Sequence, residues 1–141
     1  MPIHQKTSPP KRIHARFYAT ESGNEPVKET LLELGRPVKT VVGEDIRFVE
    51  LNWRVDRPYV DRLRSGKGRY EETLYEVRHT VEDIEYRTLF FVFGSDMILV
   101  HFLKKTSRKT PKSDLDLGWD RMKKWMHPQR DLETKAKKGR R

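Results

Sequence analysis

The hydrophobic pattern divides the chain into a first part with helical periodicity and a second part that is typical of strands. A short apolar stretch at residues 13–19 predicts an edge strand. Apolar residues then recur at three- and four-residue steps over 25–34 and over 37–53, which predicts two amphipathic helices separated by Gly35-Arg36-Pro37. Residues 56–68 contain Pro58 and two glycines, and this composition predicts a linker.

Three consecutive strands are predicted after this linker. Residues 74–79 alternate between apolar and polar side chains, residues 85–93 form an apolar run that contains Arg87, and residues 97–103 are largely apolar. Residues 80–84 and the turn Gly94-Ser95-Asp96 join them, so the strands are expected to be antiparallel neighbours. A last helix is expected from about residue 112 to Met126, before Pro128.

The order of these elements indicates a single α+β domain. We expect an antiparallel sheet of about four strands, with two N-terminal helices and a C-terminal helix packed on one face of the sheet. A length of 141 residues, of which 35% are hydrophobic, is enough for one core. The expected organisation is a flexible basic arm over 1–12, the folded domain over 13–127 and a basic tail over 128–141.

The net charge of +9 is unevenly distributed. Residues 1–16 carry four Lys/Arg and no acid, and residues 123–141 carry eight Lys/Arg against two acids. Within the nearly neutral remainder, residues 104–112 hold five unopposed cations, whereas residues 71–85 hold six acids against Arg78. Such a surface can attract a polyanion at one place and repel it at another, although charged chain ends are also commonly just solvated.

Several classes of site find no support in the sequence. The chain contains no Cys, which excludes disulfides and Cys-based metal sites or nucleophiles, and no apolar run approaches the ~20 residues of a membrane span. The sequence also lacks a Gly-rich phosphate loop, a His/Asp cluster with metal-ligand spacing and a nucleophile elbow. We therefore expect a cytoplasmic protein without metal or organic cofactor.

Five strings of the sequence, in order, resemble the phage-derived HigB branch of the RelE/ParE toxin superfamily over roughly residues 14–126: YATESGNEPVKETLLELG, LYEVR, YRTLFF, ILVHFLKKTSRKTP and LDLGWDRMKKW. The resemblance implies a compact fold like that of microbial RNases. It also implies the toxin of a type II toxin–antitoxin system, which would be a ribosome-dependent endoribonuclease that cleaves mRNA. A helix-turn-helix antitoxin from the same operon would neutralise it.

RNA cleavage suits a sheet that carries cations, because the neighbouring 2′-hydroxyl attacks the phosphorus and the protein has to position and neutralise the phosphate. The resemblance places the catalytic cations at Arg78, Arg87, Lys105 and Lys104. The candidate RNA-binding residues are Arg108, Lys109, Lys112 and His79. Lys104 and Lys105 are adjacent in the chain, so at most one should face the site, and we favour Lys105.

Alternatives remain open at the level of sequence. Arg78 can instead pair with Glu76 or Glu85, and His101, in an apolar strand, is better interpreted as a core histidine than as a catalytic one. The segment after Lys105 offers only Thr, Ser, Arg and Lys as polar side chains before the next helix, which leaves the proton-transfer groups unassigned. The alternative functions are a ParE-like toxin that inhibits gyrase and a non-catalytic nucleic-acid-binding protein.

Overall fold

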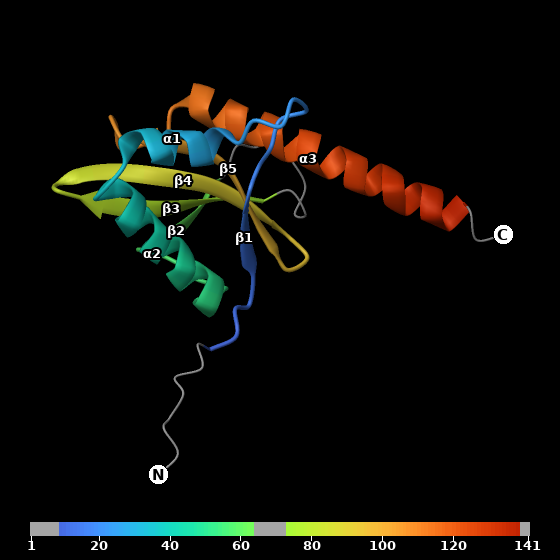
Figure 1. The fold of residues 1–141 in the computed structure, drawn as a ribbon, viewed down its shortest axis with the longest axis horizontal. Coiled ribbons are helices and arrows are strands. Elements are labelled where there is room, and N and C mark those ends of the chain that lie inside the picture. Colours follow the sequence, from blue (N-terminus) through green and yellow to red (C-terminus); the bar gives the residue numbers. More distant parts are fainter. Residues whose placement is uncertain (1–8, 64–72, 139–141) are drawn as a thin grey trace, which may run out of the picture.

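A computed structural model of the chain describes residues 9–63 and 73–138, and it describes side chains as far as residue 127. Figure 1 shows the order of the elements. They are β1 (His14–Phe17), α1 (Pro26–Leu34), α2 (Val38–Asn52), β2 (Val60–Leu63), β3 (Leu74–Val81), β4 (Ile84–Phe93), β5 (Asp96–Lys104) and α3 (Lys112–Lys138). The predicted arm lies partly outside the described residues. Its last residues contact α2, since Lys11 pairs with Glu50 at 3.0 Å.

The strands form one open, mixed sheet in the order β1-β5-β4-β3-β2. β1 runs parallel to β5, and the other neighbouring pairs are antiparallel. The expectation of about four antiparallel strands therefore needs two corrections, because the fifth strand, β2, lies within the predicted linker and β1 is parallel to its neighbour. β2 is four residues long and follows Pro58, so its sequence is too short to show a strand period.

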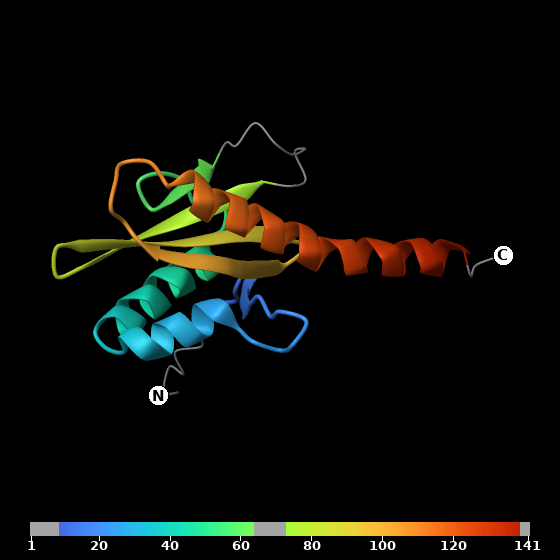
Figure 2. The ribbon, with the colours of Figure 1, turned by 90° about the horizontal axis from the view of Figure 1, so that it is seen from above.

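The helices cover both faces of the sheet, which corrects the prediction of a single covered face. Figure 2 shows α1 and α2 on one side, here called the helix-pair face, and α3 on the other, here called the α3 face. The reason lies in β4 and β5, whose successive side chains are buried on opposite faces. Phe90 packs in the core under α1 and α2, and Phe91 packs in the core under α3.

The third helix continues past Pro128 to Lys138, so the prediction that it ends near Met126 is wrong. A proline inside a helix removes one backbone hydrogen bond, but favourable helix formers such as Leu132, Glu133 and Ala136 follow it. Met126 is the last buried side chain of α3 among the described ones. Beyond it the helix extends past the sheet (Figure 1).

Candidate functional site

Charged side chains meet on the α3 face, at the end of the sheet formed by the β3–β4 hairpin. Arg78 and Arg87 lie directly opposite each other in the β3–β4 register, and Thr80 opposes Glu85. Glu76 precedes Arg78 by two residues and therefore lies on the same face. We call Glu76, Arg78, Glu85, Arg87 and Lys105 the charged cluster.

Arg87 is buried at the centre of this cluster, with 3% of its surface exposed. Its Nε lies 3.2 Å from Glu76 Oε1, and its Nη2 lies 3.7 Å from Glu85 Oε2. The guanidinium also donates to Thr110 Oγ1 at 2.8 Å and to the Arg108 carbonyl at 3.0 Å. Arg87 thus holds the loop of residues 105–111, and direct contact with an RNA phosphate would require these bonds to open.

Glu76 is the acidic partner that makes this burial possible. Its side chain is 1% exposed, and besides pairing with Arg87 it accepts a hydrogen bond from the Thr110 hydroxyl. A buried charge is tolerated only when it is paired and hydrogen-bonded. The Glu76–Arg87–Thr110 network therefore fixes the basic loop to the sheet.

Arg78 is the more accessible of the two sheet arginines, with 36% of its side chain exposed. It pairs with Asp61 of β2 at 3.1 Å and approaches Glu76 at 3.9 Å. The alternative pairing of Arg78 with Glu76 is therefore present. The closer partner, Asp61, belongs to β2, a strand that the sequence analysis did not predict. More than a third of the Arg78 side chain is exposed, so Arg78, unlike Arg87, is accessible from solvent.

Lys105 and Lys104 lie on opposite sides, as expected from their spacing. Lys105 Nζ lies 2.6 Å from Glu85 Oε2, and the lysine is half-buried within the charged cluster. Lys104 is exposed and lies opposite Tyr86, whose ring belongs to the core of the helix-pair face. Of the two lysines, only Lys105 joins the cluster.

The loop after β5 presents the remaining cations to solvent. Arg108, Lys109 and Lys112 are exposed. Among the described residues, none of the three forms an ion pair, so their charges are available to a polyanion. They follow Lys105 in the chain, and the Glu76–Arg87–Thr110 network holds this loop against the sheet.

The structure separates both histidines from these cations. His79 lies on the helix-pair face, fully buried, with Nδ1 at 2.8 Å from Asp45 and Nε2 at 2.7 Å from Thr88. His79 therefore lies apart from the charged cluster and exposes no side-chain atom to RNA. This corrects the prediction that His79 is one of the RNA-binding residues. His101 faces α3 and lies 2.6 Å from Asp114, in agreement with its interpretation as a core histidine.

The sequence pattern of phage-derived Gp49-like proteins (DUF891) matches residues 29–123, about two thirds of the chain. The chain belongs to this family. Gp49-like proteins form a toxin-like family of toxin–antitoxin systems, which implies an antitoxin partner. No curated protein matches the chain. The matched segment spans the whole charged cluster and the loop that follows it.

The Gp49-like chain has no cluster of three or more His, Asp or Glu that could hold a metal ion among the residues the structure describes. In the same part of the chain, no helix is long and apolar enough to cross a membrane.

Sequence reasoning named Glu76 and Glu85 only as alternative partners of Arg78, and it missed Asp61 and Thr110 of this Gp49-like site. The alternation of β3 does place Glu76 on the face of Arg78, so that neighbour was within reach of the pattern. Asp61 was hidden in the supposed linker, and Thr110 lies 34 residues from Glu76. Nothing in the local sequence predicts that long-range contact.

The Lys105–Glu85 pair predicts a pH-dependent stability. The hydrogen bond from Lys105 lowers the pKa of Glu85 below its ordinary value of 4.5, assisted by the charges of Lys105, Arg87 and Arg78 and opposed by burial. A lowered folded-state pKa stabilises the fold above the ordinary value, and this contribution is lost as the pH falls through the folded-state pKa. Glu85→Gln should therefore lower Tm by about 2–4 °C at pH 7, corresponding to about 1 kcal/mol, and by progressively less as the pH falls below 4.5. Calorimetry over a series of decreasing pH values checks this, and a decrease in Tm that does not shrink as the pH falls would contradict it.

Proposed function

We propose that this chain is a HigB-like toxin that inhibits growth by cleaving mRNA on the ribosome. The observation that carries the proposal is the gathering of accessible cations at one end of the sheet: Arg78, Lys105, Arg108, Lys109 and Lys112. A rigid sheet and an anchored loop hold these cations, and preorganised charge of this kind favours a phosphate whose negative charge grows in the transition state.

The reaction that suits these residues is internal transesterification. The 2′-hydroxyl oxygen of the RNA attacks the adjacent phosphorus and loses its proton, while the bond from phosphorus to the 5′-oxygen breaks and that oxygen gains a proton. The products are a 2′,3′-cyclic phosphate and a free 5′-hydroxyl. The protein contributes charge and orientation, because the nucleophile belongs to the substrate.

Within this reaction we assign phosphate contact to Arg78 and Lys105. Arg78 presents a planar guanidinium that can bind two phosphate oxygens at once. Lys105 can neutralise the developing charge and exchange a proton, with Glu85 holding its ammonium group in place. Arg87 and Glu76 act as positioning residues, because they fix the loop and are themselves buried.

The acids near these cations support the proposed requirement for the ribosome. Asp61 and Glu76 pair with Arg78, and Glu85 pairs with Lys105, so part of the attraction for free RNA is cancelled. The cluster also offers few groups for proton transfer. A ribosome that presents a strained, oriented mRNA would supply the in-line geometry that this site does not impose alone.

The proposal is tested by incubating purified protein with programmed ribosomes and with naked transcript. We expect cleavage of ribosome-bound mRNA, at least about tenfold less cleavage of naked transcript, and products with 2′,3′-cyclic phosphate or 3′-phosphate ends. Because the 2′-hydroxyl mechanism needs no metal at the site, any residual cleavage of naked transcript should persist in EDTA, which is left out of the ribosome assay because ribosomes need Mg²⁺. Products with 5′-phosphate ends would overturn the mechanism. Absence of cleavage together with trapped gyrase–DNA complexes would move the chain to the gyrase-inhibiting class.

A further inference from the structure

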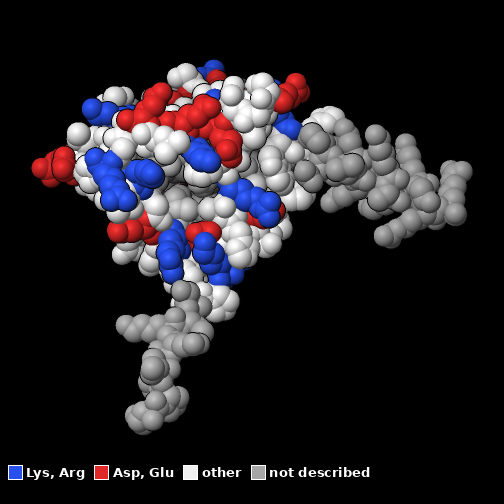
Figure 3. Space-filling view, viewed as in Figure 1, with Lys and Arg blue, Asp and Glu red and all other residues white. Residues whose placement is uncertain are grey.

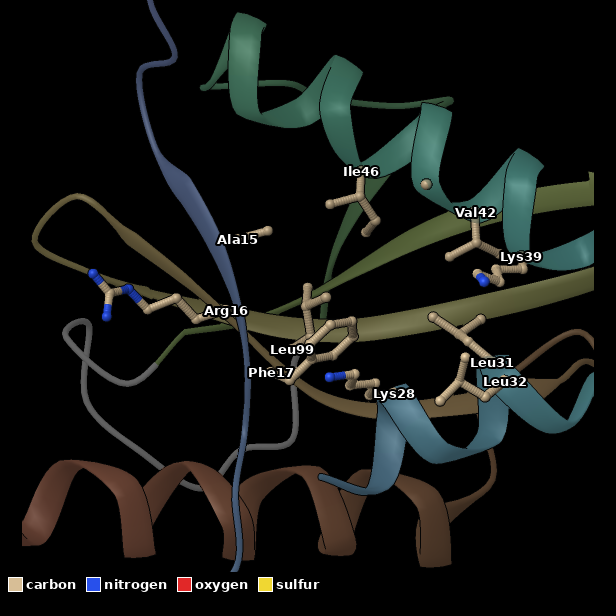
Figure 4. Close-up of a pocket in the computed structure, with 11 residues that line it drawn as sticks. Ala15, Arg16, Phe17, Lys28, Leu31, Leu32, Lys39, Val42, Ile46 and Leu99 are labelled. Carbon is tan, nitrogen blue, oxygen red and sulfur yellow. The ribbon is translucent and has the colours of Figure 1, made fainter. Parts of the chain in front are cut away.

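A groove lies on the helix-pair face, across the sheet from the charged cluster. Its walls come from β1, α1 and α2, with Leu99 of β5 at its base, and it encloses about 380 Å³. Figure 4 shows side chains from these four elements around the hollow, with Lys28 and Lys39 at its edge and Arg16 pointing away from it.

The groove is apolar inside. Its lining includes Leu31, Val42, Ile46 and Leu99, which are buried, and Leu32, which is 56% exposed. An exposed leucine alone is ordinary, but here it borders a hollow whose other aliphatic side chains are already in the core. The groove is therefore suited to apolar side chains that come from outside the domain.

Gly43 gives a second, independent indication that the groove has an occupant. It lies within α2 and lines the groove, and a Cβ added to it would meet no atom within 4 Å. Glycine destabilises a helix relative to alanine, so its presence is not explained by packing within this chain. A partner that approaches the α2 backbone closely would explain it.

The charged side chains at the groove indicate which kind of partner it can bind. Arg16, Lys28 and Lys39 are among its lining residues, and none of the lining residues is acidic. Lys28 lies 3.7 Å from Glu25, whereas Lys39 forms no ion pair within the described part of the chain. Figure 3 shows basic side chains around the middle of this face and acidic ones over α1. The groove therefore favours a ligand that carries carboxylates beside apolar groups.

We propose that the groove binds an amphipathic, acidic segment of the antitoxin. Apolar side chains at helical spacing would enter the hollow, and carboxylates on the same segment would face Lys28 and Lys39. A second copy of this chain fits less well, because two molecules of net charge +9 repel each other. The proposal rests on the toxin role of the chain, but it does not depend on RNA cleavage.

The structure provides a matched pair of variants on α1. Leu32→Glu places a carboxylate in the groove, whereas Leu34→Glu makes the same change at a leucine that is also exposed (42%) and does not line the groove. The probe is the antitoxin encoded in the same operon, and affinity is measured by calorimetry. We expect Leu32→Glu to raise Kd by at least about 30-fold, as for a central interface residue, and Leu34→Glu to change it by less than about threefold.

Gly43 supplies a test that does not add charge. Gly43→Ala should raise Tm, because alanine favours the helix and its Cβ meets nothing in the isolated chain. Gly43→Met should leave the fold intact and raise Kd for the antitoxin by at least about tenfold, because its side chain would fill the groove. Unchanged affinity of both Gly43→Met and Leu32→Glu would overturn the proposal.

The test separates the groove from the proposed nuclease activity. Leu32→Glu should still arrest growth, while coexpressed antitoxin should no longer relieve the arrest. A protein that binds the antitoxin through the groove but cleaves no mRNA would disprove only the nuclease. If the groove variants instead change the oligomeric state of the isolated chain and leave antitoxin affinity unaltered, the occupant is a second copy and the proposal is wrong.

Discussion

Glu76→Gln should lower the free energy of unfolding by about 3 kcal/mol or more, which is the largest effect on stability expected from a single change in the charged cluster. The substitution keeps the shape of the side chain and removes its charge. Arg87 then remains 3% exposed, with Glu85 at 3.7 Å as its remaining ion-pair partner. Leaving a buried charge without close compensation is costly because water cannot solvate it. Urea denaturation measures the change.

A matched control and a double-mutant cycle isolate this effect. Glu33→Gln changes an exposed carboxylate on α1 and should alter the free energy of unfolding by less than about 0.5 kcal/mol. Glu76→Met and Arg87→Met should each be strongly destabilising. The double variant should lower the free energy of unfolding by less than the sum of the two single variants, because neither charge is then left unpaired. Strict additivity would contradict a direct Glu76–Arg87 interaction.

The strands that carry the cluster were predictable because each of β3, β4 and β5 is long enough to show its pattern. The alternation of β3 placed Glu76 and Arg78 on one face, and the largely apolar sequence of β5 predicted a strand. The same apolar run should have predicted helices on both faces, which the element order alone did not show. β2 escaped prediction because four residues after a proline carry too little periodicity.

The side-chain partners were less predictable than the strands. A sequence shows that Arg87 lies in an apolar strand, but whether its guanidinium reaches solvent depends on Glu76 and Thr110, which come from other elements. His79 shows the same dependence, because Asp45 of α2 and Thr88 of β4 occupy both of its ring nitrogens. Alternation assigns a residue to a face, whereas burial and pairing are decided by what covers that face.

We therefore assign different functions to the two faces of the sheet. The α3 face presents accessible cations at one end, and the helix-pair face presents an apolar groove with lysines at its edge. An antitoxin segment in the groove would leave Arg78 and Lys105 uncovered. Neutralisation would then require a second antitoxin segment over the cluster, or the bulk of the antitoxin to exclude the toxin from the ribosome.

Lys105→Ala should reduce the rate of mRNA cleavage about 100-fold, the largest loss of activity expected from one accessible residue. Removing one preorganised charge contact at a transition state costs on the order of 3 kcal/mol, and each 1.4 kcal/mol is about tenfold in rate. Lys104→Ala is the matched control, because that lysine is the neighbour in sequence, is exposed, and lies on the opposite side of the sheet. It should keep the rate within about threefold of the parent.

Lys105→Arg distinguishes the two roles that Lys105 can have. If it only neutralises the phosphate, the arginine variant should recover most of the activity, because its charge is retained. If it also exchanges a proton, the arginine variant should stay close to Lys105→Ala, because a guanidinium does not titrate near neutral pH. Initial rates on programmed ribosomes measure both variants, with melting curves to verify that each is folded. A folded Lys105→Ala protein that cleaves at the parental rate would remove this residue from the site, and equal losses in Lys104→Ala would indicate general attraction for RNA in place of a localised site.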